Sequence, residues 1–108
     1  MKKKLNNGLR IIFKKKNNNS VTLSVLVKTG SNYENKGEEG ISHFIEHLLF
    51  EGTKKRTSQE ITNSIESLGG DMNAFTSHEA TVYFITIPKK HFDIALYILS
   101  DMIQNPKF

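Results

Sequence analysis

The sequence predicts an α+β fold, a mainly antiparallel sheet with helices packed on one face. Short runs rich in β-branched and aromatic residues occur beside segments whose apolar residues recur every three or four positions. The strand-like runs come in two pairs, and each pair is joined by a short polar turn, which is typical of antiparallel neighbours. The predicted order of elements is ββααββα.

The first half of the chain contains one predicted hairpin and one predicted helix. Residues 9–14 and 21–28 form β-rich runs, and the turn between them is centred on residues 17–19, which are all Asn. Residues 29–40 are polar, contain three Gly and show no periodicity, so they predict a loop. The helix that follows is expected to end around Gly52.

A second helix is predicted to begin at Thr57. Thr57 and Glu60 have the spacing of a capping box, and Gly69 and Gly70 are typical of a helix end. The residues expected to be buried along this helix are Ile61, Ile65 and Leu68.

Two strands and a last helix complete the prediction. The strands are residues 71–76 and 81–87, with a turn at residues 77–79 and Pro88 closing the second strand. The last helix is expected at about residues 90–104. Its predicted apolar face consists of Phe92, Ala95, Leu96, Leu99, Met102 and Ile103.

Composition restricts the class of protein and of site. The chain has no Cys, so a metal site must use His and carboxylate ligands. No apolar run approaches the length of a membrane span, and no secretory signal is recognisable, so a cytoplasmic location is expected. Every charged residue among the first 16 is basic, but Phe13 is the only aromatic residue that interleaves with them. This pattern favours a soluble edge hairpin over a nucleic-acid-binding surface.

The candidate functional residues are His43, Glu46 and His47, which form the pattern His-x-x-Glu-His. On a helix these three side chains share an arc of about 100°. The apolar residues of the same segment fall on the opposite side, which is therefore predicted to be buried. These residues are Ile41, Phe44, Ile45, Leu48 and Leu49.

Two imidazoles and a carboxylate on one helix face suit a zinc hydrolase. Neutral imidazoles bind zinc, one coordination position stays open for water, and a nearby carboxylate can act as the base. The five residues 43–47, the pentad, match the inverzincin pattern, the reverse of His-Glu-x-x-His. The pentad alone leaves open a simpler interpretation, two surface histidines on an amphipathic helix.

The flanking residues extend the pattern over essentially the whole chain. In combination, these stretches closely resemble the pitrilysin (insulinase-like) family of zinc peptidases, which includes the mitochondrial processing peptidases. The matching stretches are residues 7–10, 37–53, 68–70, 73–83 and 105–108.

The resemblance implies a role for each of the three candidate residues. His43 and His47 would be zinc ligands, and Glu46 would be the general base. The third ligand of such a site would be a Glu on a later helix, beyond Phe108. Glu51 is the alternative within the chain, although its position predicts a solvent-exposed side chain.

The resemblance also implies substrate-binding and supporting residues. Asn73 and Ala74 would lie on an edge strand and hold the backbone of a peptide substrate. Glu79 would support the site through a hydrogen bond, or it is only a carboxylate in a turn. Tyr83 is expected in the core. The two remaining histidines, His78 and His91, are expected at the surface.

The sequence therefore favours a zinc-dependent endopeptidase that acts on extended peptides. Residues 1–108 would form the N-terminal part, about half, of one pitrilysin-like catalytic domain. A homologous second domain or subunit would close over the site, and the chain alone would be inactive. The alternatives are a catalytically inactive family member that binds peptides or has a structural role, and a structural domain without zinc. No nucleic-acid partner and no membrane span are expected.

Overall fold

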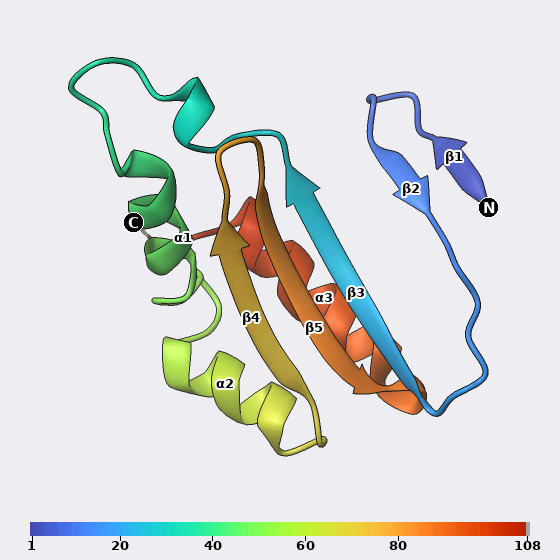
Figure 1. The fold of residues 1–108 in the computed structure, drawn as a ribbon. Coiled ribbons are helices and arrows are strands. Elements are labelled where there is room, and N and C mark those ends of the chain that lie inside the picture. The colour runs from blue at the N-terminus through green and yellow to red at the C-terminus, as the bar shows by residue number, and fades with distance from the viewer. Residues whose placement is uncertain (108) are drawn as a thin grey trace.

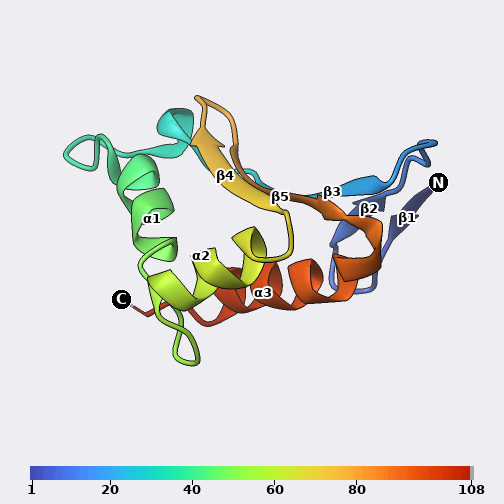
Figure 2. The same cartoon turned by 90° about the horizontal axis from the view of Figure 1, so that it is seen from below.

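The structure is a computed structural model that describes residues 1–107. It contains a three-stranded antiparallel sheet, two α-helices that cover one face of that sheet, a third α-helix at one edge of it, and a separate N-terminal hairpin (Figures 1 and 2). Within these residues no helix is long and apolar enough to cross a membrane. The α+β class with helices on one face of an antiparallel sheet is confirmed.

The sheet has the order β3-β5-β4, with β5 in the centre. Strand β3 is Ser20–Val27, β4 is Asp71–Thr76 and β5 is Thr81–Pro88, so the two strands predicted in the second half are confirmed. Successive residues of β5 alternate between buried and partly buried, as the two faces of a strand require. β4 forms one edge of the sheet.

The core lies between β5 and the helices. Helix α2 (Ser58–Glu66) and helix α3 (Phe92–Gln104) cover the inward face of the sheet (Figure 2). Their apolar side chains pack on the inward residues of β5, and this burial is the main stabilising contribution. The buried apolar residues are Leu49, Ile61, Ile65, Tyr83, Ile85, Ile87, Ala95, Ile98, Leu99 and Met102.

Helix α2 has the ends that its sequence predicts. The Thr57 hydroxyl accepts from the backbone N–H of Glu60, and the Glu60 carboxylate accepts from the N–H of Thr57. At the other end Gly69 adopts a positive φ of 81°, and the N–H of Gly70 donates to the carbonyl of Ile65. The capping box and the glycine end are both confirmed.

The predicted buried face of α3 is wrong at one position. Leu96 is 45% exposed, whereas Ile98, which the prediction omitted, is 2% exposed. Ile98 lies three residues after Ala95 and four before Met102, so it belongs to the same helical stripe. The helix itself begins at Phe92, after a 3-10 turn at Lys89–His91.

The predicted N-terminal hairpin is also wrong. Strand β2 (Arg10–Ile12) pairs with β1 (Lys2–Lys4), whereas β3 pairs with β5. The tight turn at Asn7 and Gly8, where Gly8 has a φ of 93°, closes the β1–β2 hairpin within a few residues. Pairing with β5 lets the alternating apolar residues of β3 reach the core. Figure 1 shows the hairpin standing apart from the sheet.

Candidate metal centre

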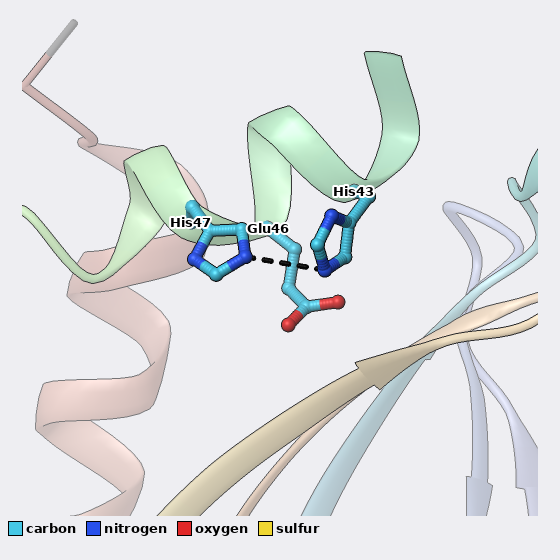
Figure 3. A group of neighbouring side chains, drawn as sticks. All are labelled: His43, Glu46 and His47. Atoms are coloured by element: carbon cyan, nitrogen blue, oxygen red, sulfur yellow. Dashed lines mark hydrogen bonds between the residues drawn. The ribbon is translucent and has the colours of Figure 1, made fainter. Parts of the chain in front are cut away.

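Three residues of the pentad, His43, Glu46 and His47, converge on one point beside the sheet. Helix α1 (Ile41–Leu49) carries them and packs against β4. The Nε2 atoms of His43 and His47 are 3.1 Å apart, and the two rings meet edge to face. Figure 3 shows the carboxylate of Glu46 beside this pair of nitrogens. One ligand atom from each residue lies within 4.8 Å of the others.

The spacing of the two histidines fits one zinc ion. Tetrahedral zinc with Zn–N bonds of about 2.0–2.1 Å places two ligand nitrogens about 3.3–3.4 Å apart. The observed separation of 3.1 Å between His43 Nε2 and His47 Nε2 is close to that value.

The carboxylate of Glu46 is buried and held in place. Glu46 is 8% exposed, and its Oε2 accepts a hydrogen bond from the hydroxyl of Thr76, at the end of β4. This bond occupies one carboxylate oxygen and leaves Oε1 for another partner. Burial raises the pKa of Tyr83, and the negative charge of Glu46 raises it further. As predicted, Tyr83 lies in the core.

The orientation of α1 differs from the prediction. Its apolar side was expected to be buried, but Phe44 is 60% exposed, and Ile41 and Ile45 are exposed too. Of the predicted buried residues only Leu49 is fully buried. Helices α2 and α3 already cover the inward face of the sheet, so α1 lies at its β4 edge and turns its Glu46 side toward β4.

Glu34 caps helix α1 from the preceding loop. The N-cap residue is Gly40, which has a φ of 87° and no side chain to offer. Instead, Glu34 accepts from the N–H of Gly40 and from the N–H of Ser42, each at 2.9 Å. These bonds, that from Ser42 first, lower the pKa of the Glu34 carboxyl.

The sequence prediction missed Glu34 and Thr76. A helix preceded by Gly rather than by a capping side chain is a weak signal that another residue supplies the cap. For Thr76 the signal is alternation, because Thr76 shares the inward face of β4 with Met72 and Ala74.

The predicted substrate-binding residues lie on the edge strand. β5 pairs with one side of β4, and within residues 1–107 no strand pairs with its other side. The side-chain oxygen of Asn73 accepts from the backbone N–H of Ala74 at 2.8 Å, so the N–H of Ala74 points away from β5. An extended peptide could pair with β4 on this side, next to the pentad helix.

Other predicted residues lie away from the pentad. Glu79 is exposed in the β4–β5 turn, and its carboxylate makes no hydrogen bond within the described residues. Glu51 is exposed, as predicted, and does not belong to the group formed by the pentad. His78 is exposed, as predicted, and its Nδ1 contacts the hydroxyl of Ser31. His91 is only partly exposed.

A shallow pocket of about 250 Å³ opens beside His43. It lies between the N-terminus of α1 and the end of β4, so it adjoins the candidate metal centre. The residues that line it are Ser31, Glu34, Gly40, His43, Thr76, Ser77 and His78.

Comparison with known proteins identifies the class to which this fold and site belong. The family description Insulinase (Peptidase family M16) matches residues 10–108. The chain is 30% identical to a protease from Helicobacter pylori of known crystal structure, with a TM-score of 0.94 over 100% of this chain and 26% of that one. The chain therefore belongs to the insulinase family, peptidase family M16.

Two curated relatives have more similar sequences. An uncharacterized zinc protease of Rickettsia bellii (strain RML369-C) is 46% identical over 106 residues, which are 97% of this chain and 26% of that protein. The beta subunit of the mitochondrial-processing peptidase of Dictyostelium discoideum is 42% identical over 105 residues, 96% of this chain and 22% of that protein. The chain thus spans about a quarter of the length of these relatives.

Proposed function

We propose that residues 1–108 supply the metal-binding, N-terminal part of the catalytic domain of a zinc endopeptidase. One observation carries the proposal. His43 and His47 present two Nε2 atoms 3.1 Å apart, and the buried Glu46 carboxylate lies beside them. The names of two relatives, a zinc protease and a processing peptidase, support the same class of reaction.

His43, Glu46 and His47 divide two roles between them in this proposal. His43 and His47 bind zinc through Nε2. When bound, zinc polarises the peptide carbonyl and lowers the pKa of a bound water. Thr76 holds Glu46 through Oε2. Glu46 then accepts, at the free Oε1, the proton that the attacking water loses.

The third zinc ligand is proposed to be a Glu outside residues 1–108. Catalytic zinc sites ordinarily have three protein ligands. Among the described residues the pentad is the only group of three candidate ligands, and Glu46 is needed as the base. The role proposed for Glu79, support of the site by a hydrogen bond, requires a partner beyond those that residues 1–107 offer.

The proposed substrate is an unfolded or short peptide in extended conformation. It would add to the free edge of β4, where its backbone would meet the outward amide of Ala74 and the side chain of Asn73. In strand addition the hydrogen bonds go to the backbone of the peptide rather than to its side chains, so peptides of many sequences can bind. A second homologous domain or subunit would close over the bound peptide, and the chain alone would be inactive.

The test uses the longer protein that contains this chain. We expect one zinc per catalytic domain and cleavage of an unfolded peptide that a chelator stops. The double variant His43→Ala, His47→Ala should lose both. His91→Ala, which removes a histidine outside the group, should keep both. Stoichiometric zinc in the double variant would refute this site. Zinc without cleavage in the unmodified protein would favour an inactive, peptide-binding subunit.

A further inference from the structure

We propose that Glu34 is a positioning residue that holds the histidine-bearing helix against the edge strand β4. The proposal rests on the proposed function, because it concerns the same His43 and His47 pair. The carboxylate of Glu34 makes its hydrogen bonds to Gly40 and Ser42 and none to either histidine. It acts through the backbone of the first turn of α1.

The N-terminus of α1 depends on Glu34 for its cap. The first N–H groups of a helix have no partner within the helix. The N–H of Ile41 donates to the carbonyl of Glu38, but those of Gly40 and Ser42 donate to the two carboxylate oxygens of Glu34. Both oxygens are therefore used, and the negative charge lies at the positive end of the helix.

The loop that carries Glu34 is itself hydrogen-bonded to the turn that follows β4. The N–H of Asn32 donates to the carbonyl of His78 at 2.8 Å, and the N–H of Ser31 donates to that of Ser77 at 3.3 Å. The Ser31 hydroxyl also contacts the His78 ring. Gly30 permits this approach, because a Cβ on Gly30 would lie 2.2 Å from the carbonyl oxygen of Ser77.

Two links therefore join α1 to β4. One runs from the β4–β5 turn through residues 30–34 to the first turn of the helix. The other is the Thr76–Glu46 hydrogen bond, one turn further along the helix. His43 lies between Ser42 and Glu46, which are the two points of attachment. Together the two links fix the position of the helical turn that carries His43 relative to β4, and its rotation about the helix axis.

The substitution Glu34→Gln, in the longer protein, separates this role from a general charge effect. The amide keeps one acceptor oxygen, but its NH₂ group would face a backbone N–H, so one cap bond is lost. The matched control is Glu39→Gln. Glu39 carries the same charge in the same loop, but its carboxylate accepts from the N–H of Gly37 and makes no hydrogen bond to the helix.

We expect Glu34→Gln to weaken zinc binding about 10- to 100-fold in chelator competition, the range found when supporting partners of metal ligands are lost. The visible spectrum of the cobalt-substituted protein should change, and kcat should fall more than KM rises. Glu39→Gln should match the unmodified protein in each measurement. Gly30→Ala should reproduce the Glu34→Gln pattern, because it displaces the same loop while leaving the carboxylate intact.

If Glu34→Gln and Gly30→Ala both keep unmodified zinc affinity and cobalt spectrum, the positioning role is refuted. If Glu34→Gln does not fold, Gly30→Ala decides by the same two measurements. An unmodified protein that binds no zinc through His43 and His47 would instead refute the proposed function. The two failures are therefore distinguishable.

Discussion

The substitution Glu46→Gln isolates the chemical role of the proposed base. Glu46 is 8% exposed and accepts from the Thr76 hydroxyl, and the amide oxygen of Gln can accept the same bond in a side chain of the same size. Replacing a charge-assisted hydrogen bond by a neutral one costs about 1 kcal/mol. The fold and the two histidines should therefore be retained.

The expected effect on turnover is much larger than the effect on stability. The amide cannot accept the proton of the attacking water, so the contribution of the general base is lost. That contribution is typically about 10²–10⁴-fold in rate. It corresponds to about 2.7–5.4 kcal/mol of activation free energy. Since Glu46 is not a proposed ligand, zinc content should stay at one per catalytic domain.

The assay is peptide hydrolysis by the longer protein, with zinc content and melting temperature measured on the same samples. Thr76→Val provides a graded comparison, because it keeps the carboxylate but removes the hydrogen bond that orients it. A loss of about tenfold or more is expected there, from a bond to a charged group worth about 1.5–3 kcal/mol. Near-normal hydrolysis by the Glu46→Gln variant would refute the assignment of Glu46 as the base.

Two further predictions concern stability and association. Bonds from Thr53 first, then from Asn105 and Arg56, hold the pKa of the buried Asp101 below its usual 3.8. Because the pKa of Asp101 is lower in the folded than in the unfolded state, its ionised carboxylate stabilises the fold above the unfolded pKa, and this stabilisation is lost as the pH falls through the folded pKa. In urea unfolding, Asp101→Asn should therefore flatten the loss of stability below about pH 4. At neutral pH this variant should be about 1–3 kcal/mol less stable. If the variant loses stability at low pH as steeply as the unmodified protein does, this role of Asp101 is contradicted. The chain alone should cleave no peptide and should self-associate through the exposed apolar side of α1, so Phe44→Ser should reduce the mass seen by light scattering. A monomeric chain that cleaves peptides in a chelator-sensitive way would contradict this expectation.

Much of the fold follows from local patterns. The capping box of Thr57 and Glu60 and the alternation of β5 are read directly from spacing, because both depend on neighbours within a few residues. The convergence of His43, Glu46 and His47 is equally local, since residues three and four apart on a helix share a face. The structure brings these three together as their spacing predicts.

Only the tertiary structure determined the contacts between residues that are far apart in the chain. The hydrophobic pattern of α1 predicted the wrong buried side, because the rest of the fold determines what covers a helix. The alternation of β3 predicted a strand but not its partner, since β3 pairs with the distant β5, whereas β2, the neighbour in sequence, pairs with β1. The Glu34 cap and the Thr76 bond join elements whose approach no local spacing encodes. Spacing along one helix thus determined which groups can meet a metal, and packing determined how they are held.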